Sequence, residues 1–456
     1  MTHFDLISIG SGSSGRKIAV GLKRAGWNTA IVEADVDHHF GGTCINTGCI
    51  PTKAIVEVSN TVREFKTAME LKNKIVERIH SGTLRNAREK VGTTVINGFA
   101  KFVDSHTIEV NGEKYTADYI VIATGSEPAI PPIKGLSEVS YKTSKDTLDL
   151  NHLPEHMLII GGGRIGLEFG QAFHNLGVKV SVFEGLPHLL PGEDEEMADA
   201  IKAHLVEQGI SIYTGKFVDE VRESKANGKT TYTVVLKDGP NAGEYEGDYL
   251  LVATGRVPRT SGLNLEAAGV ETNRRAVVIN EFMQTSQPHI FAVGDVTGNP
   301  MFTNWAAWQA GVVLNNLKKN KTKSDQWEPL RMPHIPRLTF THPELASTGL
   351  TEKEAKEKYG EENVVVVKFY NKWLGKSMIV GDWTGFLKGI GLKGSNEILG
   401  VHLWGIRTAS LLQMVILAMD NGLGWKELAN MVYGHPILAE GIESLSKMML
   451  GKVFSQ

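Results

Sequence analysis

Cys44 and Cys49 are the only cysteines in the 456-residue chain, and four residues stand between them. A continuous α-helix would place their Cα atoms about 7.5 Å apart, beyond the roughly 7 Å limit for a disulfide. We therefore expect the backbone to leave the helical conformation between them, where Gly48 supplies conformational freedom. Pro51 suits the first turn of a following helix. This pattern predicts a redox-active dithiol near a helix N-terminus, which stabilises the reactive thiolate form.

Two other interpretations of the cysteine pair are a structural disulfide and a metal site. A disulfide that closes so short a loop adds little stability, and disulfides are rare in cytosolic chains. Two thiolates would need further metal ligands, and the nearest histidines, His38 and His39, do not stand at metal-ligand spacing. We therefore adopt the redox dithiol and expect no resident metal.

A glycine-rich turn precedes the cysteine loop and has the context of a dinucleotide-binding fingerprint. The expected order is a buried strand, a glycine turn, a helix and a second strand, at residues 4–9, 10–15, 16–25 and 28–32. Gly10, Gly12 and Gly15 would let the backbone approach a pyrophosphate at the helix N-terminus. Glu33, which ends the second strand, would accept hydrogen bonds from ribose hydroxyls. Residues 51–91 are expected to be mostly helical.

The same pattern recurs later in the chain, and the spacing from Gly10 to Glu33 equals that from Gly161 to Glu184. The expected elements of this second copy are a strand, a glycine turn, a helix and another strand, at 157–160, 161–166, 167–176 and 179–183. Each copy later reaches a matching Ala-Thr-Gly strand, at 118–125 and 248–255. A single glycine motif is weak evidence, but two matched copies predict two nucleotide-binding domains.

The last third of the chain has a different pattern. A buried strand at 288–294 ends at Asp295, where an acid beside glycine suits a ligand hydroxyl or a helix cap. From about residue 336 the expected strands are antiparallel, and no third glycine fingerprint appears. The expected strands and helices of this α+β domain are 364–369, 386–392, 398–403, 411–421 and 441–450. Four tryptophans are expected to be core or interface residues: Trp373, Trp383, Trp404 and Trp425.

Composition excludes several classes of function. The formal net charge is −3 at pH 7, and no basic block interleaved with aromatic residues favours nucleic-acid binding. No apolar run approaches the roughly 20 residues of a membrane span. Met1–Gly10 lacks the layout of a signal peptide. We expect a soluble, cytoplasmic protein of about three domains that binds neither nucleic acid nor membranes.

Two nucleotide-binding domains combined with one dithiol resemble the class I pyridine nucleotide-disulfide oxidoreductases. This flavin-dependent family includes dihydrolipoamide dehydrogenase, glutathione reductase and mercuric reductase, and the resemblance covers nearly the whole chain. The motifs that carry it are Gly10-x-Gly12-x-x-Gly15, Cys44 to Cys49 with Lys53, both Ala-Thr-Gly strands, Gly161 to Gly166 with Glu168, Val293-Gly294-Asp295, and His435-Pro436 with Glu440. The cysteine loop is more similar to that of the mercuric-reductase-like branch than to that of glutathione reductase. We expect neither a terminal cysteine pair nor a metal-binding N-terminal domain, which counts against mercuric reductase itself.

The resemblance implies an α/β fold with two Rossmann-like FAD/NAD(P)-binding domains and a C-terminal α+β dimerisation domain. The expected boundaries are 1–150 and 276–335 for FAD binding, 151–275 for NAD(P) binding and 336–456 for the interface. The implied cofactor-binding residues are Gly10, Gly12, Gly15, Glu33, Gly42, Thr43, Lys53, Thr124, Gly125, Gly294, Asp295, Gly161, Gly163, Ile165, Gly166, Glu184, Gly255 and Arg256. No arginine cluster follows Glu184, so NAD(H) is expected in preference to NADP(H).

The resemblance also implies catalytic roles. Cys49 would lie against the flavin as the charge-transfer thiol, and Cys44 would exchange with a small thiol or disulfide substrate. Lys53 stands four residues after Cys49, on the same helix face, and would pair with Glu168 near the flavin. A buried Lys-Glu pair is costly to keep for stability alone, which favours a functional role over solvated helix charges.

His435 is the expected acid-base residue. Pro436 suits the first turn of a helix, from which Glu440 could reach back to one imidazole nitrogen. The alternative is a capping histidine with a solvated glutamate. The family resemblance implies that this histidine comes from the neighbouring subunit of a homodimer with shared active sites. We expect the other pair, His342-Pro343, to be structural.

Two features depart from the family pattern. Arg164 occupies a position by the nicotinamide pocket where relatives often carry an aromatic or aliphatic residue, and Tyr433-Gly434 precede His435 where a His-Ala pattern is usual. The expected function is electron transfer between NAD(H), flavin, the Cys44-Cys49 pair and a thiol or disulfide, similar to dihydrolipoamide dehydrogenase. The alternatives are a mercuric-reductase-like reductase of a metal ion or another oxidised small molecule, and a subunit serving mainly assembly with dehydrogenase-complex partners.

Overall fold

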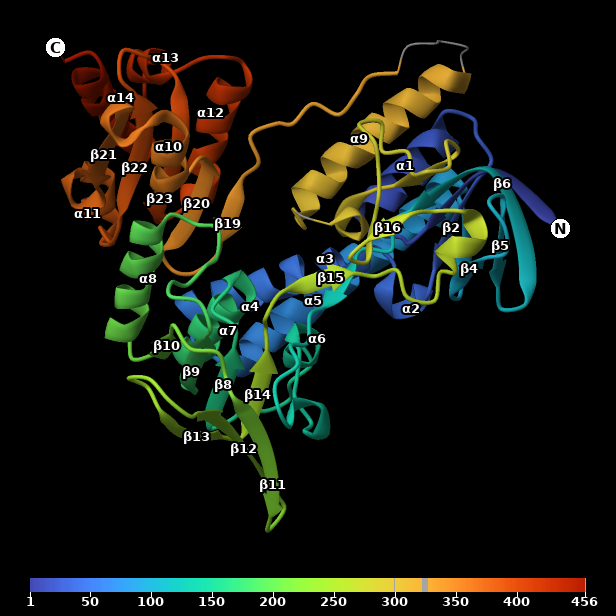
Figure 1. Cartoon of the computed structure of the whole chain (residues 1–456), viewed down its shortest axis with the longest axis horizontal. Coiled ribbons are helices and arrows are strands. Elements are labelled where there is room, and N and C mark those ends of the chain that lie inside the picture. Colours follow the sequence, from blue (N-terminus) through green and yellow to red (C-terminus); the bar gives the residue numbers. More distant parts are fainter. Residues whose placement is uncertain (299, 322–326, 456) are drawn as a thin grey trace.

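The computed structural model describes residues 1–298, 300–321 and 327–455 (Figure 1). The strands of the first sheet are β1 Thr2–Ile9, β2 Thr29–Glu33, β3 Thr94–Asn97, β4 Ala100–Phe102, β5 Thr107–Val110, β6 Glu113–Ile122 and β18 Ile290–Ala292. They follow the order β3-β2-β1-β6-β5-β4, and β18 also pairs with β6. The pairs β2–β3, β1–β2, β1–β6 and β6–β18 are parallel, and β4 and β5 extend the sheet antiparallel. Asn111-Gly112 turns the β5–β6 hairpin with positive φ at both residues.

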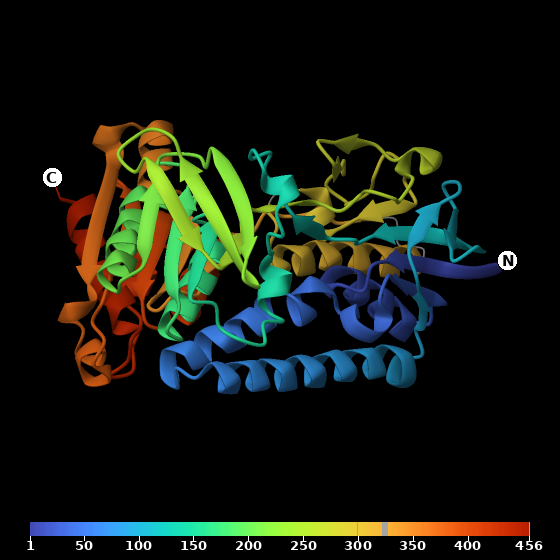
Figure 2. The same cartoon turned by 90° about the horizontal axis from the view of Figure 1, so that it is seen from below.

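The first sheet is covered by helices that also carry the cysteines. These helices are α1 Ser13–Arg24, α2 Val36–His39, α3 Gly42–Asn46, α4 Cys49–Thr61, α5 Phe65–Arg85, the π-helix η1 Asn86–Val91 and α9 Thr303–Lys321. Helices α1 and α9 lie side by side, because Gly21 of α1 lets Leu314 of α9 approach; a Cβ there would lie 2.7 Å from Leu314 Cδ2. In Figure 2, α4 and α5 run together along one edge towards the C-terminal domain.

The second nucleotide unit repeats the first. Its elements are β8 His156–Ile160, α7 Arg164–Asn175, β9 Lys179–Glu184, α8 Glu195–Glu207, β10 Ser211–Thr214 and β14 Tyr249–Val252, with an outer sheet of β11 Glu220–Ala226, β12 Lys229–Leu236 and β13 Gly243–Gly247. The parallel order β10-β9-β8-β14 places β8 between β9 and β14, as β1 lies between β2 and β6. The predicted duplication of the strand-glycine-helix-strand pattern is confirmed.

Short elements link these parts. They are β7 Ser126–Pro128, η2 Leu136–Glu138, α6 Ser144–Thr147, β15 Arg256–Pro258, η3 Leu265–Ala268, β16 Thr272–Asn273, β17 Ala276–Val277 and η4 Gly294–Thr297. Strands β7 and β15 cross antiparallel between the two units. The predicted strand 288–294 is shorter than expected, since the backbone enters a 3-10 turn at Gly294, where φ is +78°. The domain boundaries stay predictions.

The C-terminal part forms an antiparallel sheet packed by helices. Its elements are β19 Arg337–Thr339, β20 Glu344–Gly349, α10 Glu352–Tyr359, η5 Glu361–Asn363, β21 Val364–Tyr370, η6 Asn371–Trp373, α11 Gly375–Val380, β22 Phe386–Leu392, β23 Ile398–Gly405, α12 Thr408–Asp420, α13 Trp425–Ala429 and α14 Glu440–Val453. The sheet order is β19-β20-β23-β22-β21. Trp425 is fully buried beneath β22 and α14, and Trp404 is also buried, whereas Trp373 and Trp383 are more than half exposed.

One prediction about this part is wrong. Helix α14 begins at Glu440, so Pro436 does not occupy its first turn. The physical reason is the Glu440 carboxylate, whose Oε2 accepts a hydrogen bond from the Ile437 backbone N–H at 2.8 Å while Oε1 lies 2.8 Å from His435 Nδ1. These contacts hold a turn before the helix. The expected His435–Glu440 contact is nevertheless present.

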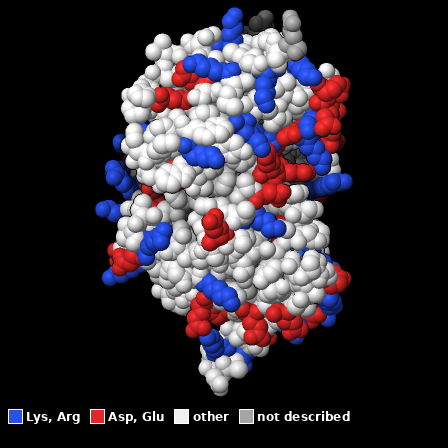
Figure 3. Space-filling model, turned by 90° about the vertical axis from the view of Figure 1, so that its left-hand side faces the viewer, with Lys and Arg blue, Asp and Glu red and all other residues white. Residues whose placement is uncertain are grey.

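One face of the molecule carries basic and acidic side chains of the C-terminal domain and α8. In Figure 3, which faces the C-terminal domain and α8, basic and acidic residues are interspersed, and no extended basic area is visible on that face. Several large apolar side chains of the C-terminal domain are exposed, including Met378, Ile379, Leu417 and Val432. Among the helices of the described residues, none is long and apolar enough to cross a membrane.

A buried charge cluster joins the second nucleotide unit to the C-terminal sheet. The Lys388 side chain is 1% exposed, and its Nζ lies 2.7 Å from Asp194 Oδ1, 2.7 Å from Glu352 Oε2 and 3.0 Å from Glu196 Oε2. Burial opposes the charge, but hydrogen bonds to Asp194 and Glu352 outweigh it and raise the pKa of Lys388. The cluster therefore fixes how α8 sits against β22.

Replacing Lys388 with methionine should lower the free energy of unfolding by about 3 kcal/mol, because it leaves the buried Asp194 carboxylate without its cation. Chemical denaturation measures the loss. Lys353→Met is the matched control, since Lys353 is 67% exposed and pairs with Glu195 at the surface; its effect on the free energy of unfolding should stay within about 0.5 kcal/mol. Equal stability of the two variants would contradict a structural role for the cluster.

Candidate active site

A cleft of about 2280 Å³ runs between the two nucleotide units and past the cysteine loop. Both glycine turns and both cysteines line it, and Phe340 and Gln413 close it from the C-terminal domain. The predicted residues along its wall include Gly10, Gly12, Glu33, Gly42, Thr43, Lys53, Thr124, Gly125, Gly161, Gly163, Ile165, Glu168, Glu184, Gly255, Arg256, Gly294 and Asp295. The cleft therefore connects both predicted cofactor sites to the sulfur pair.

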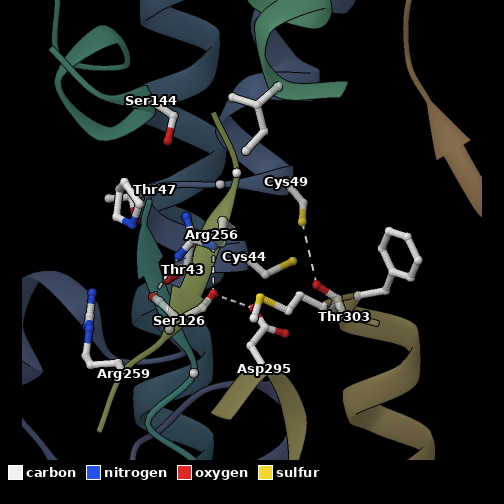
Figure 4. Close-up of a pocket in the computed structure, with 18 of the residues that line it drawn as sticks. Thr43, Cys44, Thr47, Cys49, Ser126, Ser144, Arg256, Arg259, Asp295 and Thr303 are labelled. Carbon is white, nitrogen blue, oxygen red and sulfur yellow. Dashed lines mark hydrogen bonds between the residues drawn. The ribbon is translucent and has the colours of Figure 1, made fainter. Parts of the chain in front are cut away.

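The two cysteines lie on different helices. Helix α3 ends at Asn46 and α4 begins at Cys49, so the backbone leaves the helix between the two sulfurs as expected. Gly48 is needed there, because a Cβ would lie 2.9 Å from the Thr43 carbonyl oxygen. Both thiols are free in the described structure; Cys44 is half-buried and Cys49 is exposed to the cleft (Figure 4).

The environment separates the acidities of the two thiols. A hydrogen bond from Cys44, another from Thr303, whose Oγ1 is 3.6 Å from Cys49 Sγ, and the Lys53 charge together lower the pKa of Cys49 to about 6, although burial opposes this. The same contact with Cys49, together with burial, raises the pKa of Cys44 well above its ordinary value. The reduced pair therefore consists of a Cys49 thiolate and a Cys44 thiol at neutral pH.

The Lys53–Glu168 pair stands beside the thiolate. Lys53 Nζ donates to Glu168 Oε2 at 2.5 Å and lies 4.9 Å over the Phe340 ring. The Glu168 side chain is 3% exposed, and its Oε1 accepts from the Phe340 backbone N–H at 2.9 Å. The predicted pair is thus formed, with Glu168 buried and Lys53 about one-third exposed, and Glu168 also contacts the C-terminal domain.

The first glycine turn forms a cradle that fits a dinucleotide. Gly10 has φ +107°, and a Cβ there would lie 2.3 Å from the Ala123 carbonyl oxygen, so α1 begins against the sheet. A Cβ at Gly12 would meet no atom within 4 Å, so the backbone faces open cleft. Glu33 accepts from the Ser11 N–H at 3.1 Å and the Ser11 hydroxyl at 2.5 Å. Helix N-terminus, open glycine edge and strand-end acid together suit a pyrophosphate and ribose.

The second turn repeats this geometry. Gly161 has φ +112°, and a Cβ there would lie 2.5 Å from the Ala253 carbonyl oxygen. Glu184 accepts from the Gly162 N–H at 2.8 Å and the Leu186 N–H at 2.9 Å. Gly163 again faces open space. The site therefore fits a second dinucleotide.

Some predicted residues support the cleft from behind or lie away from it. Gly15 and Gly166 do not line the cleft. A Cβ at Gly15 would lie 2.4 Å from the Gly10 carbonyl oxygen, and a Cβ at Gly166 would lie 2.1 Å from the Gly161 carbonyl oxygen, so each glycine lets its helix pack against the turn. His435 and Glu440 do not line the cleft of their own chain, and the His435 side chain is 81% exposed.

Ser126 links two predicted residues, Arg256 and Asp295. Arg256 Nε donates to the Ser126 hydroxyl at 2.7 Å and Nη2 to its carbonyl at 2.7 Å, while the hydroxyl donates to Asp295 Oδ2 at 2.6 Å (Figure 4). Thr124 Oγ1 donates to the Arg259 carbonyl at 2.6 Å. These contacts hold Asp295 in place and leave its other oxygen for a ligand.

Sequence reasoning missed Thr303, Ser126 and Glu193. Thr303 begins α9 and touches Cys49. The available signal was its position shortly after the Val293–Asp295 strand end, at the start of a helix whose N-terminus approaches the cleft. Ser126 follows the first Ala-Thr-Gly strand, and Glu193 precedes α8.

Thr303→Val should raise the pKa of Cys49, because the thiolate loses a hydroxyl donor. The rate of Cys49 alkylation in the reduced enzyme, followed by mass spectrometry against pH, should titrate near pH 6 in the wild type and about one pH unit higher in the variant. Thr303→Ser keeps the hydroxyl and should keep the wild-type midpoint. If the pH dependence of Cys49 alkylation in Thr303→Val equals that of the wild type, the Thr303 hydroxyl does not stabilise the thiolate.

No group of three or more His, Cys, Asp or Glu side chains among the described residues could hold a metal ion.

Comparison with known proteins places the site in a family. Residues 4–310 match the family described as pyridine nucleotide-disulphide oxidoreductase, and residues 335–446 match its dimerisation domain.

Several relatives are similar over nearly the whole chain. A mercuric reductase from Staphylococcus aureus is 34% identical over 96% of this chain and 81% of its own length, and a dihydrolipoyl dehydrogenase from Synechocystis is 34% identical over 97% and 98%. A solved Cu(II) complex of RclA, an HOCl-induced flavoprotein disulfide reductase from Escherichia coli, is 30% identical, covers 98% of this chain and 100% of its own, and superposes with a TM-score of 0.90. The chain therefore belongs to the pyridine nucleotide-disulphide oxidoreductases, flavoproteins that use FAD and NAD(P)H, and its dimerisation domain supports a homodimer.

Proposed function

We propose that this enzyme transfers electrons from NADH to a small disulfide substrate through the Cys44-Cys49 pair. The observation that carries the proposal is the cleft that joins both glycine cradles to the cysteines. Bound FAD would supply the two-electron relay between the nicotinamide and the cysteine disulfide. Gly10, Gly12, Gly42 and Asp295 would hold it.

The two cysteines have different roles in this proposal. The low pKa of Cys49 suits a thiolate that rests beside an electron acceptor. The raised pKa of Cys44 means that this thiol needs a base before it can attack a substrate disulfide. Lys53 stabilises negative charge near Cys49, and Glu168 keeps that ammonium in position.

We assign the base to His435 of a second copy of the chain. Glu440 lies 2.8 Å from His435 Nδ1, which fixes the ring orientation and leaves Nε2 available for proton transfer. The cleft of the same chain is not lined by this histidine, so only a neighbouring subunit could supply it. The exposed apolar side chains of the C-terminal domain support such an arrangement.

Complementation tests the shared site. His435→Gln should keep flavin reduction by NADH and lose most disulfide turnover, and Cys44→Ser should do the same. Hybrid dimers of these two variants should regain up to half of the wild-type activity per active dimer, because one of their two sites has both residues. Exchanged wild-type subunits are the control for the mixing procedure. Inactive hybrids alongside active controls would exclude a base supplied by the second subunit.

Glu184 supports NADH as the preferred reductant. Its carboxylate lies at the strand end of the second cradle, where the 2′-phosphate of NADPH would meet a like charge. We expect kcat/KM for NADH to exceed that for NADPH by about tenfold or more. Glu184→Gln keeps the shape of the side chain and removes its charge, so it should reduce the ratio of kcat/KM for NADH to kcat/KM for NADPH. A wild-type preference for NADPH in steady-state kinetics would refute this assignment.

A second candidate function is reduction of a metal ion with the same dithiol. Relatives are named mercuric reductase, and solved structures of RclA and of one of its cysteine-to-serine mutants are described as Cu(II) complexes. Assays of the reduced enzyme with lipoamide, other disulfides, Hg²⁺ and Cu²⁺ separate the two candidates. Co-purification with acyltransferase subunits would instead support membership of a dehydrogenase complex. A cytoplasmic location stays a prediction.

A further inference from the structure

Arg164 occupies the part of the cleft between the second glycine cradle and Cys49. It is the first residue of α7, and its guanidinium carbon lies 5.3 Å over the Phe302 ring. Phe302 is followed directly by Thr303, whose hydroxyl touches the Cys49 sulfur. Arg164 therefore lines the cleft on the side where the second glycine cradle approaches the cysteines.

A fully buried carboxylate holds Arg164 there. The Glu193 side chain is 0% exposed, and its Oε1 accepts a hydrogen bond from Arg164 Nη2. The other oxygen accepts from the Ser347 hydroxyl at 2.5 Å. Glu193 thus fixes the guanidinium in place. Arg164 Nε is itself buried, and among the described residues it has no hydrogen-bond partner.

Glu193 does not cancel the charge around it. Arg337 also points at this carboxylate, with Nε 3.6 Å from Oε1, so two guanidiniums share one negative charge. The neighbouring Lys53 and Glu168 form a pair of opposite charges, which adds no net charge. The group formed by Arg164, Arg337 and Glu193 therefore has a formal net charge of +1.

We propose that Arg164 makes the enzyme bind the neutral ring of NAD(P)H in preference to the cationic ring of NAD(P)⁺, and so biases it towards reduction of its substrate. The inference rests on the proposed function and deepens it by assigning a direction. Overall, NAD(P)H, one proton and a substrate disulfide become NAD(P)⁺ and two thiols. The nicotinamide ring gains a positive charge in this reaction, so a fixed neighbouring cation disfavours the bound product and speeds its release.

Equilibrium binding to the oxidised holoenzyme tests this without turnover. Three probes that cannot reduce the flavin are NAD⁺, ADP-ribose, which lacks the ring, and 1,4,5,6-tetrahydro-NAD, a redox-inert neutral mimic of NADH. The wild type should bind the tetrahydro analogue about tenfold more tightly than NAD⁺, which is the effect of one unit charge across such a cleft. It should also bind NAD⁺ more weakly than ADP-ribose. If NADPH proves to be the preferred reductant, the 2′-phosphorylated probes are used.

Variants assign the effect to Arg164. Arg164→Gln should bring the dissociation constants of NAD⁺ and the tetrahydro analogue within about twofold of each other, and Arg164→Lys should keep most of the preference. Arg222→Gln removes an equivalent charge on β11, away from the cleft, and should behave as wild type. An unchanged ratio in Arg164→Gln, or wild-type NAD⁺ binding as tight as that of the neutral analogue, would overturn the proposal.

These outcomes are separable from failure of the proposed function. If NADH does not reduce the flavin of the wild type, the proposed reductase activity fails whatever the binding ratio. If NADH reduces the flavin but NAD⁺ and the tetrahydro analogue have equal dissociation constants, only the role of Arg164 fails. If Arg164→Gln does not fold, the comparison of NAD⁺ with ADP-ribose in the wild type still decides the proposal.

Discussion

The Glu168 carboxylate is the contact on which the rest of the site depends. It lies on the helix of the second cradle, accepts from Lys53 on the cysteine helix, and accepts from the Phe340 backbone of the C-terminal domain. Three parts of the chain, distant in sequence, therefore meet at one buried acid. Without the Lys53 ammonium this buried acid would carry an uncompensated charge, so the same contact serves both packing and site chemistry. The positions of Cys49 and of the cleft wall follow from that junction.

Electrostatic interactions give the two cysteines opposite pKa shifts, and so different roles. The contacts that lower the pKa of Cys49 leave Cys44 protonated, since two thiolates so close would repel each other. Residues of the same chain are sufficient to stabilise the Cys49 thiolate. His435 of the same chain, the predicted base, lies outside the cleft. A homodimer is thus a chemical requirement of the proposed mechanism as well as a matter of exposed apolar surface.

Much of the fold was predictable from sequence because its signals are local. The glycine spacing, the strand-end acids Glu33 and Glu184, and the cysteine loop each lie within a short stretch whose geometry follows from residue type. Thr303 and Glu193 escaped prediction because their partners are far away in the sequence; nothing near Glu193 indicates that Ser347 and Arg337 will enclose it. Pro436 was misplaced for a related reason, since the Glu440 side chain, and not proline geometry, sets where α14 begins.

The crossing strands β7 and β15 have a mechanical consequence. Thr124 of the first unit donates to the Arg259 carbonyl beyond β15, and Thr254 of the second donates to the Ala129 carbonyl beyond β7 at 2.7 Å. Each nucleotide unit thus donates one threonine hydroxyl to a backbone carbonyl that follows the other unit's strand. Rotating one nucleotide unit against the other would break both hydrogen bonds and the ladder between them. The junction therefore resists hinge motion, and the spacing of the two cradles is set by the backbone rather than by whatever occupies them.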